Sequence, residues 1–275
     1  MTSATSGSPS RRARGRPPPP TRSLGDRAFD LIVWGGLAVL LIVGARGAEI
    51  SRFGDLVSGG QNMRQLADEF IRPNFTNYRL YIGEMWLTVQ MALWGTALAI
   101  VIAIPLGLAA ARNITPIWIQ QPVRRFLDVL RSVPDLVVGA IFVVAVGLGP
   151  FAGVMALAVN TGGVLGKLFS EAVEAIDRGP VEGVRATGAA PLQEVVWGVL
   201  PQVAPLWTSY ALYRFESNAR SATVLSLIGA GGIGQRLFES LEGFEYGQTA
   251  MIILVIVASV SMIDLLSQAI RTRLT

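Results

Sequence analysis

The chain has 275 residues, of which 51% are apolar and only 15% are charged, whereas about 25% of residues are charged in soluble domains. It contains neither cysteine nor histidine, which excludes disulfides, thiolate metal sites and catalysis by either side chain. The low charge favours a lipid membrane as the solvent. The formal net charge of +4 points either to a nucleic acid or to a membrane surface, and the positions of the charges decide between them.

Uncharged stretches predict six transmembrane helices, because a span needs about 20 mostly apolar residues. A basic, proline-rich tail at 1–28, which we expect to be disordered and cytoplasmic, precedes the first predicted span at 29–48. An outer loop at 49–82 follows, and the predicted core is 83–275. The core contributes five spans: 85–111, a helical hairpin of 121–148 and 151–172 that turns at Gly149-Pro150, 202–228 and 246–263. The predicted fold class is therefore all-α, a polytopic membrane protein.

The basic residues predict that both termini are cytoplasmic. In this orientation 15 basic residues lie on the cytoplasmic side and six on the outer side, as the positive-inside rule requires. The net charge is therefore a signal of topology, and we expect a lipid membrane and no nucleic acid as partner. An alternative interpretation takes Arg11-Arg12 and the apolar run at 31–45 as a signal peptide that is removed. The five spans that follow favour a retained first helix.

The cytoplasmic loop at 173–201 predicts two short helices with a sharp bend between them. Gly179-Pro180 is typical of a helix start with proline at the first helical position. Gly188 is placed to end this helix in a left-handed conformation, and Pro191 begins a second helix that ends near Pro201. Helices bounded in this way also occur in loops that bind no partner, so the pattern alone leaves docking and a purely structural role open.

Within this loop, Glu182, Gly188 and the pair Leu200-Pro201 have the spacing of the EAA motif, and here the chain resembles the ABC importer permeases. The loop departs from that motif at three positions. Where the motif has two alanines and an isoleucine, this chain has Gly183, Val184 and Gly198.

Longer segments are similar to the phosphonate-type permeases: VEGVRATGA at 181–189, VLPQ at 199–202 and SATVLSLIGAGGIG at 221–234. The resemblance covers residues 80–275 and implies a type I ABC importer permease fold in a bacterial plasma membrane. It implies a homodimer that works with two ATP-binding subunits and an extracytoplasmic substrate-binding protein. This chain has no GxxxxGK[ST] sequence. We therefore expect ATP and Mg²⁺ in the partner subunits, and no cofactor, metal or enzyme activity in this chain.

In this family the loop is a coupling helix that sits in a groove of the ATP-binding subunit. The resemblance implies that role for Glu182, Arg185, Gly188, Leu200 and Pro201. Glu182 and Arg185 would supply polar contacts to the partner. Their spacing of three residues equally allows them to pair with each other on one helix.

Three charged residues, Arg214, Glu216 and Arg220, lie within the predicted fifth span. A charge at the centre of a bilayer costs at least about 2.5–3.5 kcal/mol on insertion scales, so it is normally paired or functional. Glu216 and Arg220 can pair at i and i+4, which leaves Arg214 without a partner in its own helix. Two interpretations stay open. One is an anion path formed by Arg214, Arg220, Ser217 and Asn218, because arginine binds oxyanions with two hydrogen bonds; the other is an internal ion-pair network that includes Asp135 or Asp264.

The glycine-rich segment at 229–234 satisfies the GxGxxG pattern of dinucleotide-binding folds. That fingerprint follows a strand and precedes an acidic residue about 20 residues later. Here it follows a long apolar helix, and the next predicted span has no such acid. We instead expect a flexible outer turn where backbone segments approach closely. The candidate outer gate consists of Gly229, Gly231, Gly232 and Gly234.

The leading hypothesis is a permease subunit that forms the translocation path for phosphonates or related phosphorus oxyanions, driven by ATP hydrolysis in a separate subunit. An alternative is a permease of the same family for phosphite, hypophosphite, methionine or an organosulfonate. A secondary transporter or channel is a third hypothesis, and it would need no ATPase partner. An enzyme fits least well, because no pair of nucleophile and base marks a site.

Overall fold

The computed structural model describes residues 24–50, 54, 59, 64 and 67–274. The predicted tail up to residue 23 lies outside the described residues, as does much of the predicted outer loop. The chain divides into two compact units, residues 1–63 and 64–275. In the first unit, helix α1 (Leu24–Gly47) contains an apolar stretch of 18 residues, Ala28–Ala45, that is long enough to cross a membrane. Every regular element in the described ranges is helical, as predicted.

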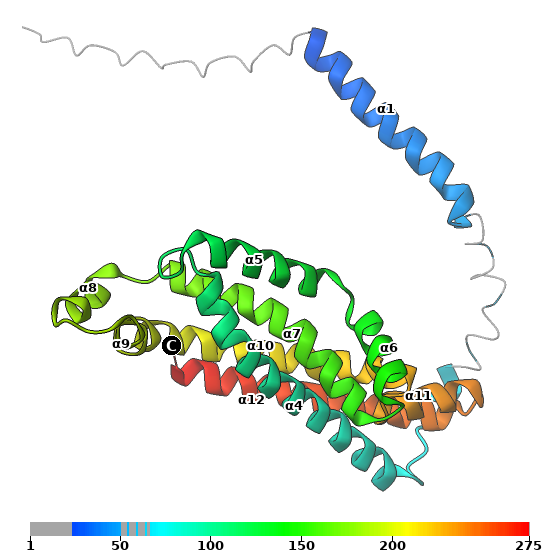
Figure 1. The fold of residues 1–275 in the computed structure, drawn as a ribbon. Helices are drawn as coiled ribbons and strands as arrows, with labels where there is room; N and C mark the ends of the chain where they lie inside the picture. The colour runs from blue at the N-terminus through cyan, green and yellow to red at the C-terminus, as the bar shows by residue number, and fades with distance from the viewer. Residues whose placement is uncertain (1–23, 51–53, 55–58, 60–63, 65–66, 275) are drawn as a thin grey trace, which may run out of the picture. The chain divides into compact units, whose positions relative to one another are not determined.

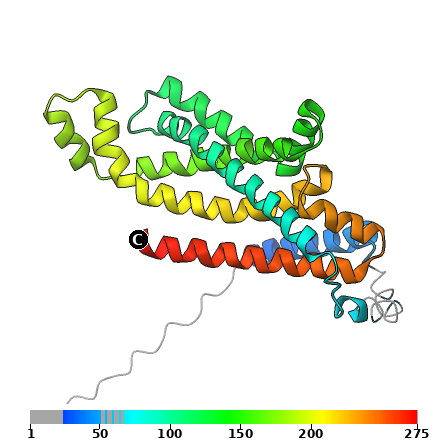
Figure 2. The ribbon, with the colours of Figure 1, turned by 90° about the horizontal axis from the view of Figure 1, so that it is seen from below.

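Four long helices form the core of the second unit and run alongside one another (Figures 1 and 2). Their bounds are α4 Tyr78–Ala110, α7 Pro150–Glu174, α10 Leu200–Leu225 and α12 Tyr246–Leu274. Helices α4 and α7 pack most extensively, because small residues let their backbones approach. A Cβ atom at Gly95 would lie 2.6 Å from Leu157 Cβ, and one at Gly107 would lie 2.7 Å from Phe169 Cβ.

The predicted third span is broken rather than continuous. Helices α5 (Ile117–Ser132) and α6 (Asp135–Val146) meet at a bend of 90°, so the prediction of one helix over 121–148 was wrong. A proline disfavours helical backbone at the preceding residue, and Val133 is indeed extended, with φ −86° and ψ 125°. Asn160 of α7 donates a hydrogen bond of 2.9 Å to the Val133 carbonyl, which satisfies a backbone group that the break leaves free.

The number of spans is compatible with six. Among the described residues, four helices are long and apolar enough to cross a membrane, and the bent pair makes five. Helix α10 corresponds to the predicted span at 202–228. Its three charged residues make it less apolar than the other long helices, but its 26 residues have a length of about 39 Å at 1.5 Å per residue, enough to cross a membrane. The last helix, α12, continues 11 residues beyond the predicted end at 263.

Shorter elements occupy the two ends of the bundle. The predicted hairpin turn is present, since Gly147 and Gly149 have positive φ and α7 begins at Pro150. Helices α8 (Arg178–Ala186) and α9 (Pro191–Glu194) project at the same end as the C-terminus (Figures 1 and 2). At the other end, the short helix η3 (Ser226–Ile228) leads through the glycine-rich turn into α11 (Ile233–Glu242), which the sequence analysis did not predict.

Candidate functional site

The loop between α7 and α10 folds into the predicted pair of short helices, with one difference at its start. Asp177 caps α8 by accepting a hydrogen bond of 3.0 Å from the Gly179 N–H. The helix therefore begins at Arg178, and Pro180 takes its third position instead of its first. Gly188 has φ +81° and donates a hydrogen bond of 3.0 Å to the Arg185 carbonyl, so the predicted left-handed turn is confirmed.

The second short helix does not end near Pro201, contrary to the prediction. Helix α9 passes into a π-helical turn, η2 (Val195–Val199), and then directly into α10. Proline has no N–H to donate, and in this wider turn Leu200 N–H donates to the Val195 carbonyl five residues back. Because such a turn keeps the helical path continuous, Leu200 and Pro201 form the first turn of a transmembrane helix instead of a helix end.

An ion pair joins the two short helices. Arg185 Nε lies 3.0 Å from Glu194 Oε1, and Arg185 Nη2 lies 2.8 Å from Glu194 Oε2. Their hydrogen bond raises the pKa of Arg185 and lowers that of Glu194. The alternative pairing of Arg185 with Glu182 is not formed in the described part of the chain, because the guanidinium is turned toward α9.

Gly198 explains one departure from the EAA motif. A Cβ atom at this position would lie 3.0 Å from the Val181 Cα and 3.3 Å from its Cγ2. The buried Gly198 therefore lets α8 lie directly against η2, where the motif's isoleucine would force the two backbones apart. The departure is compatible with a packed loop.

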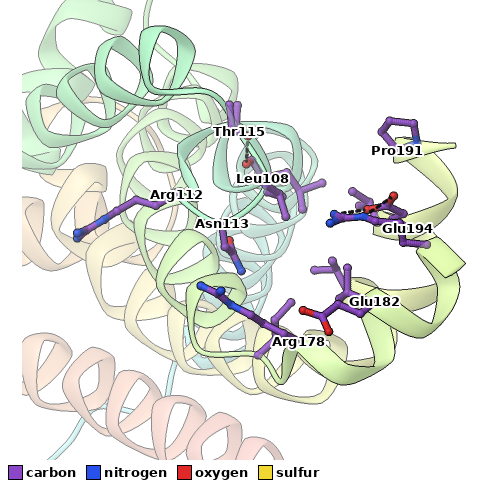
Figure 3. A pocket seen from close by; sticks show the side chains of 15 residues that line it. Leu108, Arg112, Asn113, Thr115, Arg178, Glu182, Pro191 and Glu194 are labelled. Atoms are coloured by element: carbon purple, nitrogen blue, oxygen red, sulfur yellow. Dashed lines mark hydrogen bonds and ion pairs between the residues drawn. The ribbon is translucent and has the colours of Figure 1, made fainter. Parts of the chain in front are cut away.

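A cavity of about 650 Å³ separates the loop from the end of α4 (Figure 3). Arg178 and Glu182 point into it from α8, and Asn113 faces them from the α4–α5 connection. The Asn113 side chain donates a hydrogen bond of 2.7 Å to the Val173 carbonyl. Glu182 is exposed within this space. The other side of the loop carries a second, open groove, lined by Pro180, Gly183, Val184, Thr187, Gly188, Ala189, Gln193 and Trp197.

Two large side chains near this groove were missed by the sequence analysis. Trp197 is 71% exposed and Leu192 is 74% exposed, although both are apolar. The signal was available, since a tryptophan next to a proline-bounded helix in a polar loop has no core to fill. Exposed aromatic residues of this kind are typical of protein interfaces.

Arg214 and Asn218, two candidates for the anion path, belong to one hydrogen-bonded chain across three helices. Arg214 Nη2 lies 3.4 Å from Thr161 Oγ1 of α7, and Thr161 donates 2.8 Å to Asn218 Oδ1. Asn218 Nδ2 in turn donates 2.8 Å to Thr96 Oγ1 of α4. Asn218 has no exposed surface, whereas Arg214 is half-buried. The Arg214 Nε is buried and has no hydrogen-bond partner among the described residues.

Arg220 takes part in an ion-pair network that links α10 to α12. It lies 3.2 Å from Glu216 and 3.4 Å from Asp264, so the predicted i to i+4 pair is present and Asp264 is a partner from another helix. Arg271 adds a contact of 3.5 Å to Glu216. Asp135 forms no ion pair with Arg214 within the described ranges. Ser217, the remaining candidate, is half-buried.

The glycine-rich turn brings backbone segments close together, as expected. Gly229, Gly231 and Gly232 have φ of +96°, +75° and +92°, a region that only glycine enters freely. Gly234 is inside α11, and a Cβ atom there would lie 1.9 Å from the Thr223 carbonyl oxygen. The Gly229 carbonyl accepts a hydrogen bond of 3.0 Å from Gly149, which joins this turn to the hairpin before α7.

Comparisons with known proteins find a matching family and similar relatives. The family described as "Binding-protein-dependent transport system inner membrane component" matches residues 103–275. The phosphite transport system permease protein PtxC of Stutzerimonas stutzeri is 43% identical over 217 residues, which cover 78% of this chain and 79% of that protein. The putative cryptic phosphonate transport system permease protein PhnE2 of Escherichia coli (strain K12) is 59% identical over 117 residues, which cover 42% of this chain and 96% of that protein.

A solved structure supports the fold independently. The inward-facing MetNI methionine ABC transporter contains a chain that matches with a TM-score of 0.65 at 22% sequence identity. The match covers 74% of this chain and 99% of that chain. At this identity the likeness concerns the fold alone, and that fold is the helical core described above.

Proposed function

We propose, from the premise that this chain belongs to the family of binding-protein-dependent transport system inner membrane components, that it forms the membrane path of an ABC importer for phosphorus oxyanions. The observation that carries the substrate class is the 43% identity to a phosphite permease over most of both chains. The 59% identity to a phosphonate permease adds support. Phosphonate and phosphite are both within the proposed class.

The proposed assembly contains two copies of this chain, two ATP-binding subunits and an extracytoplasmic substrate-binding protein in the bacterial plasma membrane. ATP and Mg²⁺ would bind the ATP-binding subunits. Both termini of this chain would be cytoplasmic, in agreement with the distribution of its basic residues. The C-terminus and the loop of α8 and α9 lie at one end of the bundle (Figure 2), which would then be the cytoplasmic end.

The loop would bind the ATP-binding subunit through the groove that contains Trp197. This groove is open and combines exposed apolar surface with the exposed polar side chain of Gln193. Arg185 and Gly188 would shape the loop, since Arg185 pairs with Glu194 and Gly188 makes the bend. Glu182, which is exposed, would offer its carboxylate to the partner. Leu200 and Pro201 would connect the loop to α10 without a break.

The anion path would pass Arg214, with Ser217, Asn218 and Arg220 nearby on the same helix. Arg214 is the strongest candidate for contact with the oxyanion, because its Nε is buried without a partner among the described residues. Arginine presents two parallel donors to an oxyanion. The glycine-rich turn, at the end of the bundle away from the loop, would form the outer gate through Gly229, Gly231, Gly232 and Gly234.

Uptake by the reconstituted complex tests the proposal. Vesicles that contain this chain, the ATPase and the binding protein should accumulate labelled phosphonate or phosphite only when ATP is supplied. Uptake without the ATPase would instead indicate a secondary transporter or channel. Uptake of methionine or an organosulfonate in place of phosphorus oxyanions would contradict the substrate class. Copurification of a second, different permease chain would contradict the homodimer.

Two variants separate the path from the docking site. Arg214→Ala should assemble with the ATPase but lose at least about tenfold of oxyanion uptake, because a charged hydrogen bond contributes about 1.5–3 kcal/mol. Trp197→Ala should weaken copurification of the ATPase. Trp118→Ala is the matched control, since Trp118 is 72% exposed on α5, outside the loop. Normal uptake in Arg214→Ala would exclude a role of Arg214 in the path.

A further inference from the structure

One side chain of α10 holds the start of the coupling loop. Gln202 Oε1 accepts a hydrogen bond of 3.1 Å from the Asp177 N–H, and Gln202 Nε2 donates 3.2 Å to the Asp177 carbonyl. The same Nε2 donates 2.6 Å to the Gly198 carbonyl. Both backbone groups of Asp177, the residue that caps α8, are therefore bound by one amide.

Two contacts to one residue fix its orientation as well as its distance. A single hydrogen bond would let the start of α8 rotate about the donor–acceptor line, whereas two bonds from one planar amide do not. The Asp177 side chain also accepts a hydrogen bond from the Gly179 N–H. A displacement of α8 therefore moves Asp177 with it and, through Gln202, the first turn of α10.

The other links between the loop and the bundle act at different points. Arg185 and Glu194 join α8 to α9, and Val181 packs on Gly198 in the π-helical turn. The first contact holds the two short helices together, and the second packs α8 against the turn that leads into α10. The amide of Gln202 instead closes the loop at its base, so that its entry at 177 and its exit at 202 move as one piece.

Helix α10 continues without interruption from this base to Leu225. Gln202 and Arg214 are 12 residues apart on it, which corresponds to about 18 Å along the axis at 1.5 Å per residue. Pro205 lies between the two positions and removes one backbone hydrogen bond of α10. The helix nevertheless continues past it, so a shift imposed at Gln202 reaches the depth of Arg214 and Asn218 along one element.

We infer that Gln202 is a positioning residue that transmits movement of the coupling loop to α10 and thereby couples ATP hydrolysis to transport. The inference rests on the proposed function of the chain as an ABC importer permease. It concerns a residue outside the glutamate, glycine and leucine–proline positions of the EAA motif.

The test compares Gln202→Leu with Gln121→Leu in the reconstituted complex. Leucine is similar in size to glutamine but forms none of the three hydrogen bonds. Gln121 is exposed on α5 and lies outside the loop, so its variant controls for the substitution itself. Three quantities are measured: copurification of the ATPase, ATP hydrolysis without binding protein, and oxyanion molecules transported per ATP.

Gln202→Leu should copurify with the ATPase and hydrolyse ATP within about twofold of the wild type, while transport per ATP falls about tenfold, as the loss of the hydrogen bonds predicts. Wild-type transport per ATP would overturn the inference. Loss of the ATPase on purification would also overturn it, because Gln202 would then only shape the docking surface. If the proposed function itself is wrong, the wild type and Gln121→Leu will show no ATP-driven uptake either.

A second variant covers the case in which Gln202→Leu does not fold. Gln202→Glu keeps the acceptor for the Asp177 N–H and loses the donor for the two carbonyls. Its transport per ATP should lie between the wild-type value and about one tenth of that value, because only part of the three hydrogen bonds is lost. Full coupling in this variant would overturn the inference as well.

Discussion

Replacing Asn218 by alanine tests whether this residue serves packing or the anion path. The side chain is fully buried and joins Thr161 of α7 to Thr96 of α4 through two hydrogen bonds of 2.8 Å. The variant leaves the Thr161 hydroxyl without its acceptor, whereas Thr96 still donates 2.7 Å to the Ala92 carbonyl. An unsatisfied buried polar group costs about 1–3 kcal/mol, and hydrogen bonds between membrane helices average about 0.6 kcal/mol. We therefore expect the free energy of unfolding to fall by about 1–3 kcal/mol.

Reversible unfolding of the purified chain in mixed micelles measures this loss. Thr208→Ala is the matched control, because the exposed Thr208 hydroxyl bonds only to the Ala204 carbonyl of the same helix. Oxyanion uptake per assembled complex should stay within about threefold of the wild type in Asn218→Ala, a difference below 1 kcal/mol. An Asn218→Ala chain that unfolds like the wild type but no longer transports would refute the reasoning and place Asn218 in the path.

Three further predictions concern the ends of the bundle. Gly234→Ala should lower the yield of folded protein and destabilise it by about 1–3 kcal/mol or more, because its Cβ meets the Thr223 carbonyl; Gly183→Ala, which meets nothing within 4 Å, should be tolerated. The pKa of Glu194 is lowered by its hydrogen bond from Arg185, so this pair stabilises the loop above the ordinary carboxylate pKa and is lost as the pH falls through the lowered value. Arg185→Gln should return the Glu194 pKa to its ordinary range, as a carboxylate titration followed by NMR would show. ATPase copurification with the wild type should not vary between about pH 6 and 8, since both partners stay charged there, and a marked change over that range would contradict the pairing.

Much of the fold follows from the sequence, because the length of an apolar stretch directly indicates a helix that can cross a membrane. The predicted spans at 85–111 and 151–172 lie within or close to the observed α4 and α7, since a helix is the one open structure that satisfies its own backbone in lipid. The break at Val133 was underestimated. A proline such as Pro134 within a predicted helix indicates a kink, but whether the helix bends by a few degrees or by 90° depends on a partner for the freed carbonyl.

The loop was predicted in outline, and its internal contacts were not. The positive φ of Gly188 follows from glycine at a helix end. The sequence alone could not decide which glutamate pairs with Arg185. Glu182, three residues away, and Glu194, nine residues away, are both carboxylates that could accept its hydrogen bonds. The bend at Gly188 is what brings Glu194 of α9 next to Arg185 of α8. Gln202 could not have been found for the same reason, since its partner Asp177 is 25 residues away.

The break between α5 and α6 and the charged residues of α10 lie at the same depth of the bundle. Asn160 and Thr161 are neighbours on α7; the first satisfies the Val133 carbonyl at the break, and the second contacts both Arg214 and Asn218. Lipid offers no water to either site, so each has to be satisfied by protein or to face a water-filled path. The Val133 carbonyl is satisfied by Asn160, whereas Arg214 Nε has no partner among the described residues. Because broken helices and substrate contacts meet near the midplane in transporters, we propose Arg214 as the position where the path would meet the protein's polar interior most directly.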